Sequence, residues 1–211
     1  MTVDDLLASG TAPIVAILRG VAPDAVLAIG ETLVDAGIRL IEVPFNSPDP
    51  ATSIRMLQQA FGDRAAIGGG TVLDISAVEA LAATGGTIMV TPNTNPAVIA
   101  RGVELGLEPM PGFVTPSEAF QAIAAGARRL KLFPAVAFGP AYLKSVREIL
   151  PKTVRVWAVG GTGADNLADW LAAGAEGIGV GGALYKPGDT AATVGTRARA
   201  LVAAWQAARS V

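Results

Sequence analysis

The chain has 211 residues, the length of one substantial domain, with 51% hydrophobic residues, 16% charged residues and a formal net charge of −2. This composition excludes an intrinsically disordered chain, and it offers no basic surface for nucleic acid or for an anionic membrane. The sequence contains no cysteine and no histidine, which excludes disulfides, thiolate or Ser-His-Asp chemistry, and a metal held by Cys or His. Any catalysis must therefore use carboxylates, hydroxyls, arginines, backbone amides or the four lysines.

The sequence shows no targeting or membrane segment. Asp4 and Asp5 stand where a secretory signal peptide requires positive charge. The longest uncharged stretch, Ala80–Ala100, is rich in glycine, proline, threonine and asparagine, a composition typical of turns and strands and not of a membrane span. We therefore expect a cytoplasmic protein.

Short apolar runs of β type recur along the whole chain, with starts 19 to 26 residues apart. Each interval holds one strand, one helix and two short loops, which predicts parallel βαβ units, and the wholly apolar runs indicate strands covered on both faces. The runs are Ile14–Arg19, Leu40–Phe45, Ala65–Thr71, Ile88–Pro92, Leu107–Gly112, Leu130–Pro134, Val154–Gly161 and Ile178–Gly182.

Turn and capping residues mark the same repeat. Thr115 and Glu118 form a predicted capping box around Pro116, and Asn95 precedes another helix-starting proline. A glycine precedes five of the strands at the position where a helix ends with φ above zero, namely Gly37, Gly85, Gly106, Gly126 and Gly174.

Eight βα units predict a small (β/α)8 barrel, with an open doubly wound sheet as the alternative. No linker interrupts the series, so residues 1–211 are expected to form a single domain. The segment Val3–Ala8 is predicted to be a short extra helix that closes the bottom of the barrel.

Gly177–Gly182 fits the GxGxxG pattern of dinucleotide-binding proteins, but Pro187 interrupts any following helix and no acidic residue lies at the expected ribose position. We therefore do not favour nucleotide binding. Barrels commonly hold phosphate after strands 7 and 8, where the pairs Gly160-Gly161 and Gly181-Gly182 stand. Phosphate contact is the favoured interpretation, and tight packing of the strand ends is the alternative.

Charged residues stand at the carboxyl ends of three predicted strands, where barrels place their functional groups. Alternation points Lys131 into the barrel, where burial lowers the pKa of an amine and makes it a nucleophile able to form a Schiff base. Glu42 also points inward and is the candidate acid/base. A structural Lys131–Glu42 ion pair is the alternative. Arg19 offers a forked donor to a carboxylate or phosphate. Thr71 is either a hydroxyl beside it or an ordinary strand threonine.

From about Pro13 to Pro187 the sequence resembles the class I 2-keto-3-deoxy-6-phospho-sugar-acid aldolases, on the strings IVAILRG, IEVPFNSP, IGGGTVL, VTPN, PGFVTPSEAF, LKLFPAVAFGP, WAVGG and GIGVGGALY. The resemblance implies a small (β/α)8 barrel, a homotrimer, no metal or organic cofactor, and a phosphorylated keto-acid substrate. It places the Schiff-base lysine on Lys131 and the acid/base on Glu42. The implied binding residues are Arg19, Thr71, Gly161 and Gly181.

The sequence departs from this family at two places: Gly182 stands where relatives often have a serine, and Ala135-Val136 where they often have small hydroxyl residues. The family's galactonate and gluconate substrates differ only at C4. Val159 stands where gluconate-type members have a threonine, which favours the galactonate epimer, whereas Ala135 resembles the gluconate type. We expect retro-aldol cleavage with the galactonate epimer preferred. The alternatives are a gluconate-type or dual-epimer aldolase, a metal-dependent aldolase and a non-catalytic barrel that binds a phosphorylated ligand.

Overall fold

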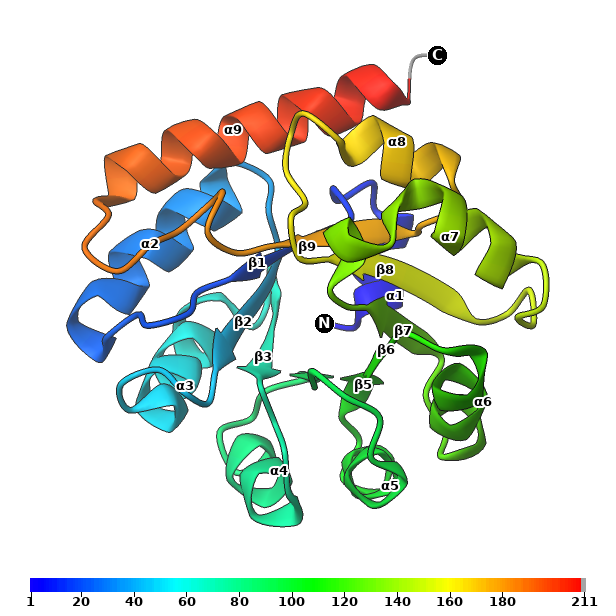
Figure 1. Cartoon of the computed structure of the whole chain (residues 1–211). Coiled ribbons are helices and arrows are strands. Elements are labelled where there is room, and N and C mark those ends of the chain that lie inside the picture. The colour runs from blue at the N-terminus through cyan, green and yellow to red at the C-terminus, as the bar shows by residue number, and fades with distance from the viewer. Residues whose placement is uncertain (210–211) are drawn as a thin grey trace.

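The computed structural model describes residues 1–209, in which strands and helices alternate along the chain (Figure 1). The strands are β1 (Ile14–Ile17), β2 (Leu40–Pro44), β3 (Ala66–Gly70), β4 (Ile88–Val90), β5 (Glu108–Met110), β6 (Gly112–Phe113), β7 (Arg129–Leu132), β8 (Arg155–Val159) and β9 (Gly177–Val180). The helices are α1 (Val3–Ala8), α2 (Pro23–Asp35), α3 (Pro50–Phe61), α4 (Ile75–Ala82), α5 (Pro96–Glu104), α6 (Pro116–Ala124), the 3₁₀ helix η1 (Ala135–Ala137), α7 (Gly139–Arg147), α8 (Leu167–Ala172) and α9 (Ala191–Ala208).

The strands form one parallel sheet in the order β5-β4-β3-β2-β1-β9-β8-β7-β6. The two ends of this order, β5 and β6, are consecutive in the chain and are separated only by Pro111. β5 pairs with β4 on one side, β6 pairs with β7 on the other, and the Pro111 carbonyl accepts a hydrogen bond from the Lys131 N–H at 2.8 Å. The predicted fifth strand is therefore a single barrel strand interrupted at Pro111, and its two parts join the two ends of the sheet into a closed barrel. This closure confirms the (β/α)8 barrel over the open sheet.

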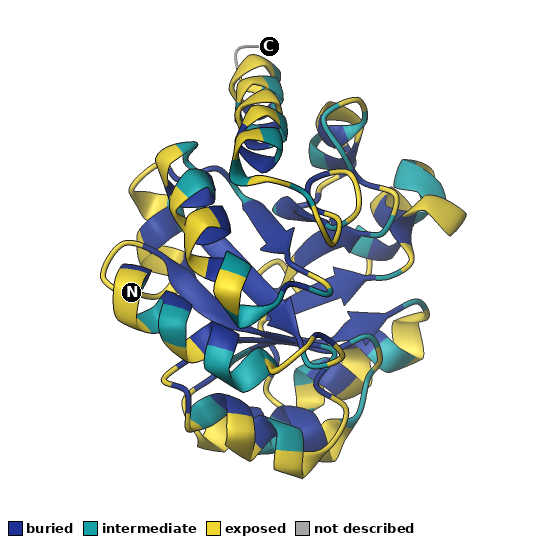
Figure 2. Cartoon of the chain, turned by 90° about the vertical axis from the view of Figure 1, so that its left-hand side faces the viewer, coloured by how far each residue is buried: buried dark blue, intermediate teal, exposed yellow. Residues whose placement is uncertain are grey.

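Apolar side chains fill two separate spaces. One cluster lies between the strands and the surrounding helices and includes the outward-facing Ile41, Val43, Leu130 and Leu132. The other fills the barrel interior. The helices turn their exposed faces outward and the strands are buried (Figure 2). No helix in the described part of the chain is both long enough and apolar enough to span a membrane.

Local signals in the sequence predicted the helix ends well. All five glycines predicted to end helices have φ between 75° and 103°. The Thr115–Glu118 capping box is present, and Asn95 caps α5 by accepting a hydrogen bond from Ala97. Seven of the eight strands were predicted one or two residues too long at the carboxyl end. At two of them the cause is visible: β3 ends at Gly70 and β8 ends at Val159, because Thr71 and Gly160 adopt positive φ and leave the sheet.

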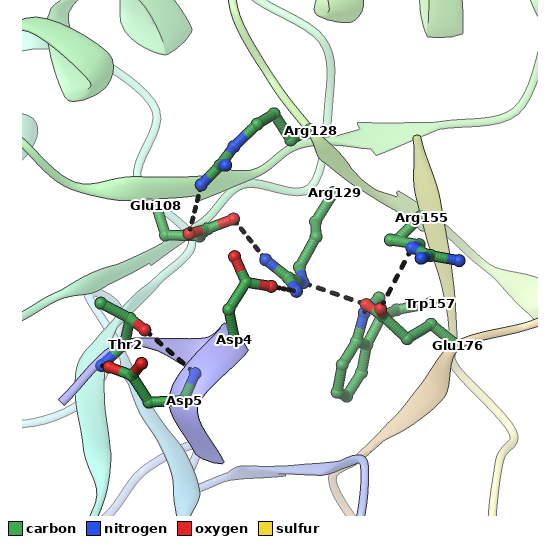
Figure 3. Close-up of polar contacts among 9 residues, drawn as sticks. All are labelled: Thr2, Asp4, Asp5, Glu108, Arg128, Arg129, Arg155, Trp157 and Glu176. Carbon is green, nitrogen blue, oxygen red and sulfur yellow. Dashed lines mark hydrogen bonds and ion pairs between the residues drawn. The ribbon is translucent and has the colours of Figure 1, made fainter. Parts of the chain in front are cut away.

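Helix α1 closes the N-terminal end of the barrel, as predicted. Its buried residues Val3 and Leu6 pack in the interior cluster with the first layer of strand side chains. A charged network fastens α1 there around the buried Arg129, which ion-pairs with Asp4 of α1, with Glu108 at 2.7 Å and with Glu176 at 3.0 Å (Figure 3). The Trp157 indole N–H donates to Glu176 at 2.7 Å.

Candidate active site

The two candidate catalytic residues lie inside the barrel, above the α1 end. Lys131 on β7 and Glu42 on β2 line one interior cavity together with apolar side chains such as Val15 and Val90. Lys131 is 6% exposed and Glu42 is 2% exposed. The alternation that sends Leu130 and Leu132 outward therefore points Lys131 inward, as the sequence predicted.

Among residues 1–209 no ion pair joins Lys131 to Glu42, because the Lys131 Nζ atom lies more than 4.0 Å from both carboxyl oxygens of Glu42. The Glu42 Oε2 atom is buried and has no hydrogen-bond partner in the same range. The Lys131 ammonium position lies 4.5 Å from the centroid of the Phe133 ring, a contact that favours its charged form. The geometry therefore gives no support to a structural ion pair.

Burial changes the proton affinity of both groups. Burial raises the pKa of Glu42 to about 7, against the opposing attraction of Lys131 and Arg19. Burial also lowers the pKa of Lys131, while attraction to Glu42 opposes this and Arg19 adds to it. Burial therefore makes the neutral, nucleophilic form of the Lys131 amine easier to reach than in water, and it gives Glu42 a carboxyl able to give or take a proton near neutral pH.

Arg19 and Thr71 meet at the rim above this pair. The Arg19 guanidinium donates to Thr71 Oγ1 at 3.4 and 3.5 Å, and to Asn46 Oδ1 at 2.6 Å. Thr71 has φ +55°, a left-handed conformation that costs a β-branched residue energy. The contact with Arg19 and this strain both speak against an ordinary strand threonine.

The remaining predicted residues line a larger cavity of about 670 Å3 at the carboxyl ends of β1, β8 and β9. It shares the side chains of Ile17 and Val159 with the cavity that holds Lys131, so the two spaces adjoin. It brings together Arg19, Phe133, Val159, Gly160, Gly161, Gly181 and Gly182.

The two glycine pairs, Gly160-Gly161 and Gly181-Gly182, differ in the structural reason for having glycine. Gly160 and Gly161 have φ +96° and +76°, and a Cβ on Gly161 would lie 2.4 Å from Val136. Gly182 has open space around it, with no atom within 4 Å of an added Cβ. Tight packing accounts for Gly161 and does not account for Gly182, which faces the cavity.

Three further residues contribute to the site without being among the predicted site residues. Asn46 holds Arg19, and Phe133 lies over Lys131. Asn166 braces the loop after β8, since it donates to the Gly161 carbonyl at 2.9 Å and accepts from the Gly163 N–H at 3.0 Å. No local pattern marks the contacts of Phe133 and Asn166; Asn46 stands directly after the predicted strand Leu40–Phe45, at a strand end where barrels place functional residues.

A desolvated amine beside a carboxyl, below a glycine-lined cavity with an arginine, defines a barrel equipped for amine chemistry on an anionic carbonyl compound. The model of the KDPG and KHG aldolase family matches residues 6–193. The chain belongs to this family.

Individual relatives agree with that membership. The chain is 45% identical to the 2-dehydro-3-deoxy-6-phosphogalactonate aldolase of Escherichia coli (strain K12) over 196 residues, which are 93% of this chain and 96% of that protein. It is 33% identical to the 2-dehydro-3-deoxy-phosphogluconate aldolase of Pseudomonas aeruginosa over 148 residues, 70% of this chain and 66% of that protein. A solved structure described as native KDPGal matches with a TM-score of 0.93 at 44% identity, over 94% of this chain and 97% of that one.

Proposed function

We propose that this protein is a class I aldolase that reversibly cleaves 2-dehydro-3-deoxy-6-phosphogalactonate to pyruvate and D-glyceraldehyde 3-phosphate. The observation that carries the proposal is the buried amine of Lys131, which has no ion-pair partner within residues 1–209 and shares an interior cavity with Glu42. The similarity to the Escherichia coli galactonate-type aldolase over 93% of the chain supports the substrate.

The first half of the reaction forms the Schiff base. The neutral Lys131 amine attacks the C2 ketone, and loss of water from the carbinolamine gives an iminium. The low dielectric of the interior and the lowered pKa of Lys131 both favour the neutral amine that must attack.

The second half breaks the carbon–carbon bond. Glu42, directly or through a water, takes the proton of the C4 hydroxyl as C3–C4 breaks, and the electron pair passes to the iminium to give an enamine. The aldehyde product leaves. Protonation of the enamine at C3 and hydrolysis of the resulting iminium release pyruvate and the free Lys131 amine.

The rim residues bind the two ends of the substrate in this proposal. Arg19 and Thr71 take the carboxylate end, where a forked donor and a hydroxyl suit a planar anion. Gly160, Gly161, Gly181 and Gly182 line the cavity for the phosphate end.

Borohydride reduction in the presence of pyruvate tests the mechanism. We expect one pyruvyl adduct, on Lys131, located by peptide mass spectrometry. An adduct on Lys144, Lys152 or Lys186, or no adduct, contradicts the assignment. A pyruvate-release assay on wild type separates the aldolase from a non-catalytic phospho-ligand-binding barrel, which would bind the keto acid without turnover.

No metal or organic cofactor is part of this mechanism. We expect full activity after dialysis against EDTA, measured by the same pyruvate assay. Loss of all activity with EDTA and its return with a divalent cation would instead identify a metal-dependent aldolase.

The C4 preference rests on Val159, a buried side chain that borders both cavities. A methyl group in place of a hydroxyl discriminates by shape, whereas a threonine would offer a hydrogen bond to one C4 epimer. We expect Val159→Thr to shift the ratio of kcat/KM towards the gluconate epimer, measured with both substrates side by side. An unchanged ratio removes Val159 as the discriminating residue.

The homotrimer and the cytoplasmic location also belong to the proposal. Exposed apolar side chains support self-association: Phe120 on α6, Val136 on η1 and Phe138 at the N-cap of α7. Light scattering at micromolar protein should give three times the chain mass, and a stable monomer contradicts the assembly.

A further inference from the structure

Three consecutive glycines, Gly68, Gly69 and Gly70, form the carboxyl-terminal part of β3. None of them has a positive φ, so the backbone conformation does not demand glycine at any of the three. What differs is the neighbour that an added Cβ would meet. At Gly68 it would lie 1.8 Å from the Ile88 carbonyl oxygen, and at Gly69 it would lie 2.7 Å from the edge of the Phe45 ring.

Gly70 alone faces a reactive group. A Cβ there would lie 1.3 Å from Glu42 Oε2, and the next two nearest atoms also belong to the Glu42 carboxyl, at 2.3 and 2.8 Å. The carboxyl therefore fills the volume that any other amino acid at position 70 would use for its β-carbon.

We propose that Gly70 is a positioning residue for Glu42, whose carboxyl is held in the barrel interior by the space that the missing side chain leaves. The inference rests on the acid/base role given to Glu42 in the proposed function. It adds the element that fixes where this group sits.

Shape is the restraint available to this carboxyl. Within residues 1–209 no hydrogen-bond donor reaches Oε2, and no ion pair fixes the group to Lys131. In the sheet register Glu42 lies beside Gly68, and Pro44 lies beside Gly70. The carboxyl therefore extends along the barrel axis to the level of Gly70, against the bare backbone of the neighbouring strand.

The experiment is a double-mutant cycle between positions 42 and 70, with aspartate as the shortened acid. Gly70→Ala is made in wild type and in Glu42→Asp, whose carboxyl is one methylene shorter and leaves room for the new methyl group. Gly69→Ala is the matched control, since it adds the same group to the same strand on the face turned towards Phe45 and Leu81. Turnover, the pH profile of kcat and thermal unfolding are measured for each variant.

We expect Gly70→Ala to lower kcat by about 100-fold in wild type, the scale of a misplaced general acid–base group. The acid limb of its pH profile should move to lower pH, because a displaced carboxyl loses the burial that raises the pKa of Glu42. In the Glu42→Asp background the same substitution should change kcat and the midpoint of thermal unfolding little, and Gly69→Ala should keep kcat near wild type.

Equal losses in both backgrounds would overturn the inference, since they mean that Gly70 serves only strand pairing. If the Gly70→Ala single variant does not fold, the inference requires that the Gly70→Ala/Glu42→Asp double variant folds. Failure of both variants to fold also overturns the inference. Borohydride trapping and turnover of wild type test the proposed function separately. Because thermal unfolding needs no activity, the coupling between positions 42 and 70 remains measurable even if that function is wrong.

Discussion

Strand β7 carries two buried cations, Arg129 and Lys131, that the protein treats in opposite ways. They are two residues apart, about 6.6 Å along the strand, and both point towards the barrel axis. At the closed end, Arg129 has three carboxylate partners, from α1, from β5 and from the loop before β9 (Figure 3). At the open end, Lys131 has no ion-pair partner in the described residues, and its nearest carboxyl is itself without a hydrogen bond at Oε2.

The difference separates stability from reactivity. A buried cation with complete ion pairing stays charged and fastens elements together, and attraction to Asp4, Glu108 and Glu176 raises the pKa of Arg129 despite its burial. A buried amine without such pairing loses its proton more readily. Strand β7 therefore contains a structural cation, Arg129, and a candidate nucleophile, Lys131, and the carboxylates around each residue account for the difference.

Replacing the unpaired cation should have the largest effect on activity. We expect Lys131→Met to lower kcat by more than about 1,000-fold, as removal of a nucleophile does, and to raise the free energy of unfolding by about 1–3 kcal/mol, because a desolvated amine is replaced by an apolar group. Pyruvate release and denaturant unfolding measure the two quantities. Lys144→Met, an exposed lysine of α7, is the control and should change neither. A destabilised Lys131→Met would mean that Lys131 is structural.

Replacing the paired cation should do the reverse. Arg129→Met leaves three carboxylates around an apolar side chain, so we expect a loss of about 3 kcal/mol in the free energy of unfolding with kcat of the folded enzyme retained. The neighbouring Arg128 is exposed and has one ion pair, to Glu108 at 3.3 Å, so Arg128→Met should cost less than about 0.5 kcal/mol. Equal costs for the two arginines would refute the structural role of the network.

The buried carboxyl should make stability depend on pH. The pKa of Glu42 rises from an ordinary value of 4.5 to about 7 in the folded protein. Between pH 4.5 and pH 7 the folded state therefore keeps a proton on Glu42 that the unfolded chain has already released. The protonated carboxyl therefore contributes stability below pH 4.5, and this is lost as the pH rises through 7. Relative to Glu42→Gln, wild type should lose roughly 3 kcal/mol of unfolding free energy across that window. Denaturant titrations of both proteins at pH 4.5, 6 and 7.5 test this, and parallel curves contradict it.

The rim should be the least sensitive part, because Arg19 is exposed to water. Asn46→Ala removes the acceptor that holds the Arg19 guanidinium at 2.6 Å. We expect KM to rise about fivefold, equivalent to one hydrogen bond of about 1 kcal/mol, with kcat nearly unchanged. Steady-state kinetics separate the two constants, and a fall in kcat at constant KM would instead place Asn46 in the chemical step.

The βα repeat and the direction of the key side chains could be predicted from the sequence alone. Apolar runs at regular intervals, Gly37 and its four counterparts, and the Thr115 capping box are local signals, because backbone conformation and strand alternation depend on neighbouring residues. The inward positions of Lys131 and Glu42 follow from the same alternation, which is why both could be singled out before the structure.

The contacts between residues far apart in the chain could be seen only in the folded protein. Asp4 and Arg129 are 125 residues apart, and Arg129 stands just outside the predicted strand Leu130–Pro134, although it is the first residue of β7. Three other features also join separate βα units: the barrel closure at Pro111, the contact of Asn46 with Arg19, and the fit of Glu42 against Gly70. Such contacts depend on barrel closure and register, which fix positions to within an ångström, and the pattern of residues along a single strand does not contain that information.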